Sequence, residues 1–194
     1  VTEAGAEAVA HSPIVTVQAA DGSGSAVVNP TSTSAGGSTA LTFGYTASGS
    51  MDGGKVSLTV DPDWPLPEGK TTASTSGSTG TLVFVGRTVT VPINNLDSSQ
   101  QILITYTADA PVTAETSTFV VSSQGTASGV LTQVGTPIEV TVGNAADGSG
   151  TATISPASVT AASTDNVLTI QYTAVATMDG GSVQLLRSGL DAMD

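Results

Sequence analysis

The chain has 194 residues, with 4 Lys or Arg against 16 Asp or Glu, so its formal net charge is −12 at pH 7. This charge excludes a nucleic-acid binder that works by neutralising phosphates, and an anionic membrane surface would repel the chain. Cysteine is absent, which excludes disulfides and thiolate metal sites. No apolar run approaches the ~18 residues of a membrane helix, so we expect no membrane insertion.

Along the chain, residues 1–11 lack a strand pattern and are expected to be an N-terminal tail or linker. From Ser12 onward, short runs of alternating apolar and polar residues are separated by clusters of Gly, Asp, Asn, Ser and Pro, and no window shows a helical period. Gly86-Arg87 indicates a tight hairpin, and the Thr/Ser-rich stretch 71–80 a solvated loop. The expected strands lie near residues 14–17, 26–28, 41–45, 56–60, 82–85, 88–91, 102–106 and 119–121.

The strongest signal is an internal repeat. Residues 20–24, Ala-Asp-Gly-Ser-Gly, recur at 146–150, and the stretch 41–47 aligns with 168–174 after a single one-residue gap. Met51-Asp52-Gly53-Gly54 then matches residues 178–181. The repeat defines a unit of 126 to 127 residues that is written once in full and once in part.

Seven or more short strands in about 120 residues predict a β-sandwich. We therefore expect an all-β fold in which residues 12–134 form a complete immunoglobulin-like β-sandwich and residues 135–194 form a partial second one. The stretches 22–30, 41–47, 51–60, 64–65, 87–91 and 102–106 resemble the tandem immunoglobulin-like repeats of large prokaryotic cell-surface proteins. The resemblance implies an extracellular or cell-surface location and a role as stalk, adhesin shaft, filament or sheath component.

Catalysis is not expected from this chain. The single histidine, His11, lies in the expected tail, and neither a Gly-x-Ser-x-Gly elbow nor a complete phosphate-binding glycine loop occurs. Glutamates are few, and none lies in an aromatic-rich stretch suited to stacking a sugar. A carbohydrate-binding module using Trp64 is a less favoured alternative.

Calcium is the one cofactor considered, and otherwise none is expected. Asp61 and Asp63 place two carboxylates two residues apart beside Trp64, and hard cations prefer several oxygen ligands from loops. Acidic residues in Asp-Gly turns are explained by backbone hydrogen bonding alone, and turn chemistry is the alternative to metal binding. Both interpretations of Asp61 and Asp63 stay open at this point.

The partial second unit suggests the function. A sandwich without its later strands leaves unpaired backbone edges and an open apolar face. A strand from another copy of the chain could fill that gap, and head-to-tail donation of this kind propagates into a fibre. We therefore expect a structural subunit of an extracellular filament or surface layer, with other copies of itself as partners. The alternative is a piece of a multi-repeat stalk or adhesin whose partners are neighbouring repeats.

Overall fold

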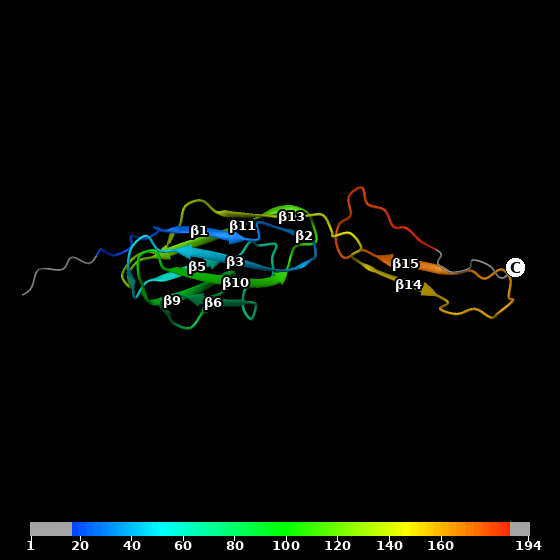
Figure 1. Cartoon of the computed structure of the whole chain (residues 1–194), viewed down its shortest axis with the longest axis horizontal. Coiled ribbons are helices and arrows are strands. Elements are labelled where there is room, and N and C mark those ends of the chain that lie inside the picture. Colours follow the sequence, from blue (N-terminus) through cyan, green and yellow to red (C-terminus); the bar gives the residue numbers. More distant parts are fainter. Residues whose placement is uncertain (1–16, 187–194) are drawn as a thin grey trace, which may run out of the picture.

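The computed structural model describes residues 17–186 and confirms the all-β fold. Within this range, two sheets pack face to face into a sandwich, and a separate two-stranded hairpin extends from one end (Figure 1). The expected tail at 1–11, the start of the first expected strand and the last eight residues lie outside the described range. No helix in the described part of the chain is long and apolar enough to cross a membrane.

The first sheet is antiparallel and has the strand order β1-β3-β10-β6. Its strands β3 and β10 pair over nine residues, from Gln101 opposite Thr46 to Asp109 opposite Ser38. The Thr/Ser-rich stretch expected as a loop instead supplies two strands, β6 and β7, because its backbone finds partners on β10 and β9. The bounds are β1 Ser25–Asn29, β3 Ser38–Thr46, β6 Thr71–Thr75, β7 Ser78–Thr79 and β10 Gln101–Asp109.

The second sheet has the order β2-β13-β11-β5-β9-β4, with β7 and β8 also on β9, and β12 on β11. The Gly86-Arg87 hairpin joins β8 to β9 as predicted, with Val85 opposite Thr88. The bounds are β2 Ser32–Ser34, β4 Met51–Asp52, β5 Lys55–Thr59, β8 Val83–Val85, β9 Thr88–Leu96, β11 Glu115–Gln124, β12 Thr132–Gln133 and β13 Ile138–Gly143.

The core lies between these sheets, where alternate residues of each strand point inward. In β10, for example, Ile102, Ile104 and Tyr106 are fully buried between exposed or half-buried neighbours. Three aromatic rings meet within the core, where Phe119 packs 5.0 Å from Phe43 and 5.5 Å from Trp64, measured between ring centroids.

Strand β13 marks where the first sandwich ends. The sequence repeat placed the end of the first unit at residue 134, yet β13 pairs with β11 in antiparallel and with β2 in parallel orientation. Its Val140 and Val142 are fully buried in the first core. The sheet of the first sandwich is thus completed by residues that the sequence repeat assigns to the opening of the second unit.

The second unit consists of β14 (Thr151–Ser155), β15 (Thr169–Thr173) and the loops around them. Thr151 lies opposite Thr173 in this hairpin, as Ser25 lies opposite Thr46 in the β1–β3 pair. These positions correspond in the repeat, so both copies fold with the same register. The second unit contacts the first through the Thr177 N–H, which donates to the Val112 carbonyl at 3.0 Å, and through Ala176, which packs on the first core.

Candidate functional site: the open second unit

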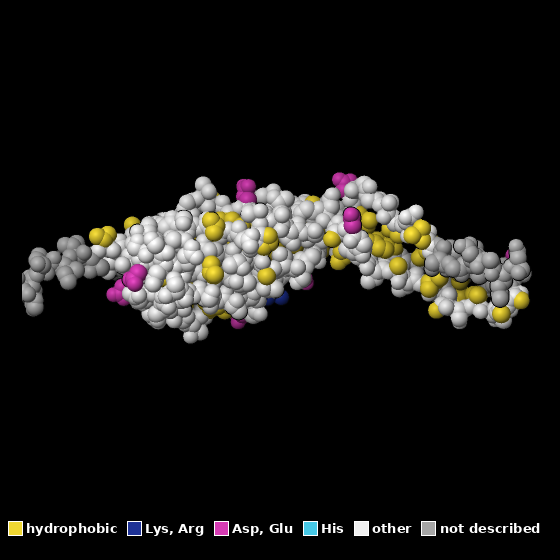
Figure 2. Space-filling model, viewed as in Figure 1, with side chains coloured by type: hydrophobic (Ala, Val, Ile, Leu, Met, Phe, Trp, Pro, Cys, Tyr) yellow, Lys and Arg dark blue, Asp and Glu magenta, His cyan; other side chains and the backbone are white. Residues whose placement is uncertain are grey.

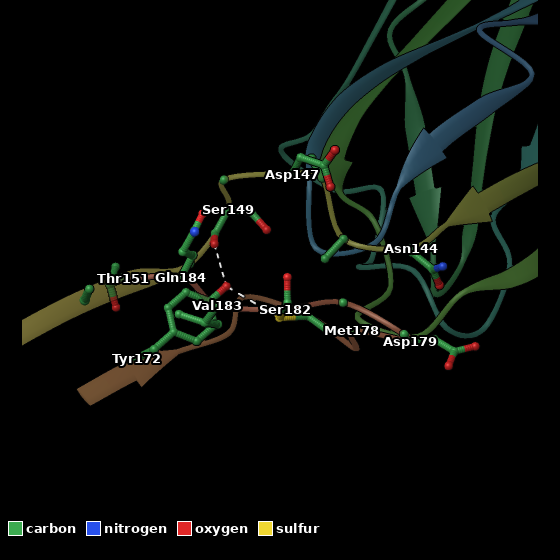
Figure 3. A pocket seen from close by; sticks show the side chains of 17 residues that line it. Asn144, Asp147, Ser149, Thr151, Tyr172, Met178, Asp179, Ser182, Val183 and Gln184 are labelled. Atoms are coloured by element: carbon green, nitrogen blue, oxygen red, sulfur yellow. Dashed lines mark hydrogen bonds between the residues drawn. The ribbon is translucent and has the colours of Figure 1, made fainter. Parts of the chain in front are cut away.

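A hollow of about 700 Å³ lies in the second unit, close to the end of the first sandwich (Figure 3). Its walls are the turn 146–150 and the segment 178–184. Between them, the Tyr172 hydroxyl donates to the Ser149 carbonyl at 2.6 Å and contacts the Met178 sulfur at 3.6 Å. This pair of contacts, drawn as dashed lines in Figure 3, gives the hollow a defined wall.

The first unit has the same wall at the corresponding residues. The Tyr45 hydroxyl donates to the Ser23 carbonyl at 3.0 Å and contacts the Met51 sulfur at 3.6 Å. Both turns need glycine before the strand. A Cβ at Gly24 would collide with the ring of Tyr45, and one at Gly150 with the phenol of Tyr172. Both glycines also have positive φ, which other residues rarely adopt. The turn and its contacts with the tyrosine are therefore the same in both units. The units differ in the residues that pack over this turn.

In the first unit, the segment after β11 covers this turn. The Asp21 carboxylate accepts the Gly125 N–H at 2.9 Å and the Val130 N–H at 2.5 Å. These backbone hydrogen bonds lower the pKa of Asp21 from its ordinary value, because they stabilise the charged form. The Ser123 hydroxyl also donates to the Ser23 carbonyl, at 3.0 Å.

In the second unit, the same positions face open space. A Cβ added to Gly22 would collide with Thr132 and Gln133, and one added to Gly53 would touch Ala127. At the corresponding Gly148 and Gly180, no atom lies within 4 Å of such a Cβ. Among residues 17–186, no hydrogen bond reaches the Asp147 carboxylate. The hollow is therefore the space that the segment after β11 fills in the first unit.

The apolar face of the second unit is open as well. Seven apolar side chains of the first unit that are at most 9% exposed correspond to side chains of the second unit, and six of those seven are 39–72% exposed. The seventh, Tyr172, is half-buried. Figure 2 shows hydrophobic side chains gathered on the surface of the second unit. The pairs are Val28 and Ile154, Leu41 and Leu168, Phe43 and Ile170, Tyr45 and Tyr172, Met51 and Met178, Val56 and Val183, and Leu58 and Leu185.

The free edge of β15 adds to this open face. Strand β3 is paired on both sides, by β1 and by β10. Within the described part of the chain, its counterpart β15 pairs only with β14. Each large apolar side chain left in water forgoes about 1.5–3 kcal/mol of burial free energy, so an apolar segment that pairs with this edge would be stabilised there.

The acidic residues predicted as a calcium site lie at one end of the first sandwich. Carboxylate oxygens of Asp61, Asp63 and Glu115 come within 4.8 Å of one another. Sequence reasoning missed Glu115 because it is brought close only through the fold, on β11. The oxygen ligands are of the type that Ca²⁺ prefers, and calcium binding at Asp61 and Asp63 stays a prediction.

Asp61 also has a structural role. Its carboxylate accepts the Asp63 N–H at 3.0 Å and the Thr118 N–H at 2.6 Å, and so fastens the 61–65 loop to β11. The Arg87 guanidinium donates to the carbonyls of Asp61 and Trp64, at 2.9 and 2.7 Å. The backbone hydrogen bonds expected of Asp61 in a turn are therefore present.

Trp64 does not offer a surface to a sugar ring. It is 1% exposed, and its Nε1–H donates to the Ser117 hydroxyl at 2.8 Å. Four other aromatic side chains are buried as well, and Phe84 and Tyr172 are half-buried. Trp64 is therefore a core residue, and the structure gives no support to the carbohydrate-binding alternative.

Fold and site together define an all-β sandwich unit followed by an open copy of its first strands. No family model matches the chain, and no curated protein matches it. Among solved structures, the chain is similar to BslA, a bacterial hydrophobin, with 17% identity and a TM-score of 0.43 over 61% of this chain and 95% of that chain.

A second solved structure with similarity is the collagen-binding domain of the Erysipelothrix rhusiopathiae surface protein RspB. It has 14% identity and a TM-score of 0.35 over 54% of this chain. The chain therefore spans 41% of the length of that structure.

Proposed function

We propose that this protein is a structural subunit of an extracellular filament or surface layer, which assembles when the open second unit takes up strands from another copy. One observation carries the proposal: apolar positions that are buried in the first unit are exposed at the corresponding places of the second. The open face and the free edge of β15 are the two features that strand addition requires.

The composition supports an extracellular location. The chain has no cysteine, few basic residues and a net charge of −12. The first sandwich is held by hydrogen bonds and by an apolar core, without disulfides. The walls of the site are glycines, polar residues, apolar side chains and the two acidic residues Asp147 and Asp179, and we infer a non-catalytic role for it.

The experiment measures assembly of the full chain by small-angle scattering and electron microscopy over a range of concentrations. Ile170→Lys places a charge on the open apolar face and is expected to prevent assembly, while the first unit keeps its thermal transition. Thr169→Lys is the matched control, because neighbouring strand residues point to opposite faces. A compact monomer at all concentrations would contradict the proposal.

A stalk built from consecutive repeats is the second candidate. It is favoured by the junction between the units, where Thr177 bonds to Val112 and Ala176 packs on the first core. In such a stalk the second unit takes its later strands from the same polypeptide. Intact mass of the protein from its native source distinguishes the two, because it reports the true ends of the chain.

A further inference from the structure

We infer that the hollow of the second unit binds residues 1–17 of a second copy of this chain, here called the donor segment. This inference rests on the proposed function and names the segment and the seat involved. In the first unit, residues 125–142 form the loop and strand that cover the turn 20–24. The hollow lies at the corresponding turn of the second unit, where this cover is missing.

The donor segment has the sequence features of residues 125–142. Thr2 and Gly5 match Thr126 and Gly129, and Pro13-Ile14 matches Pro137-Ile138, all at the same offset. After a one-residue step, residues 15–17, Val-Thr-Val, match residues 140–142. The segment before the first unit therefore reads as the final loop and closing strand of another unit.

Two of the matched positions, Thr2 and Gly5, correspond to residues that the covered turn uses, whereas Val1 stands where the first unit has Gly125. A side chain at Gly129 would collide with the Asp21 carboxylate, so the loop needs glycine there, and the donor segment has Gly5. Thr126 forms a parallel bridge with Asp52, whose counterpart in the hollow is Asp179. The carboxylate that would receive the donor's backbone N–H groups is Asp147, the counterpart of Asp21.

Of the positions that differ, the two acidic ones face water, whereas Ala10 stands where the first unit has the buried Val134. Glu3 and Glu7 correspond to Ala127 and Leu131, both of which are exposed in the first unit. Two added carboxylates at these places would remain solvated and would not enter the hollow. Val15 and Val17 instead correspond to the fully buried Val140 and Val142, and Val17 itself is 75% exposed.

The geometry makes this contact intermolecular and directional. Figure 1 shows that the described chain begins at one end of the first sandwich, whereas the second unit extends from the opposite end. A donor segment seated in the hollow would lead into the next copy as β13 leads into the second unit, so copies would follow one another in line. Such a head-to-tail contact does not close on itself, and it leaves the edge of β15 free for other strands.

The first test compares variants of the full chain by sedimentation velocity over a range of concentrations. Gly5→Val and Asp147→Asn are each expected to raise the concentration needed for self-association by tenfold or more. The matched control is Ala4→Val, since Ala4 corresponds to the exposed Ser128 and should tolerate a side chain. If wild-type chains associate and neither variant changes the association, the inference is wrong while the proposed function stands.

A second measurement detects the contact itself, at peptide concentrations above those at which the full chain is studied. A peptide of residues 1–18 is added to the full chain, and amide NMR signals are followed. Saturable shifts at Gly148, Ser149 and Gly180 are expected, and they should be absent with a peptide carrying Gly5→Val. No shift at these amides with the unaltered peptide would overturn the inference.

Discussion

Trp64 links the loop 61–65 to the core through both its ring and its nitrogen. The ring packs 6.0 Å from Tyr106 and 5.5 Å from Phe119, and Nε1–H bonds to Ser117. Trp64→Ala removes the largest buried side chain and is expected to cost about 3–5 kcal/mol in the free energy of unfolding. Ser117→Ala leaves the indole N–H without its partner and also removes the hydrogen bond that the Ser117 hydroxyl donates to Glu115 at 3.3 Å. This change should cost about 1–3 kcal/mol. Denaturant titration of both variants checks this order, and a milder effect for Trp64→Ala would contradict it.

Asp21 makes the stability of the first unit depend on pH. Its pKa is lowered in the folded protein by the N–H groups of Val130 and Gly125. The charged form is therefore favoured by folding, and this contribution is present above the unfolded pKa of about 3.9 and lost as the pH falls through the lower folded value. Asp21→Asn should lower the melting temperature at pH 7 more than at pH 3. Asp109→Asn, at an exposed position, is the control, and an equal effect at both pH values would argue against this role.

At the scale of elements, the corresponding strands β3 and β15 differ in the number of strands that pair with them. Strand β3 has partners on both edges, whereas β15 has one among the described residues. We expect the amides of β15 to exchange with deuterium faster than the corresponding amides of β3. The reason is that β15 is held by hydrogen bonds to one neighbouring strand, whereas β3 is held by hydrogen bonds to two. Exchange followed by mass spectrometry on dilute protein tests this. Protection of β15 equal to that of β3 would mean that its edge is already covered.

At the scale of the whole molecule, charge opposes assembly. Each copy carries a net charge of −12, so copies that approach end to end repel one another. Screening shortens the reach of that repulsion from about 30 Å at 0.01 M salt to about 8 Å at 0.15 M. Self-association measured by light scattering is therefore expected to strengthen as sodium chloride is added. Weakening with salt would indicate that ion pairs, and not apolar strands, hold the copies together.

The amino-acid sequence by itself determined the local features of the fold, which depend on residues close together in the chain. The glycine turns, the alternating strands and the repeat could all be predicted, because the same short sequences adopt the same turns and the same register in both units. The all-β sandwich followed from the same pattern. The Thr/Ser-rich stretch 71–80 was mistaken for a loop, since its small polar residues carry no alternation and form strands only against β10 and β9.

The tertiary structure alone decided which distant segments meet. It placed β13 in the first sandwich, brought Glu115 beside Asp61 and Asp63, and buried Trp64. It also decided that Asp21 is covered while Asp147 borders a hollow, although both stand in the same five-residue sequence. Local sequence sets the shape of a turn, but burial depends on long-range partners that only the assembled sheets provide.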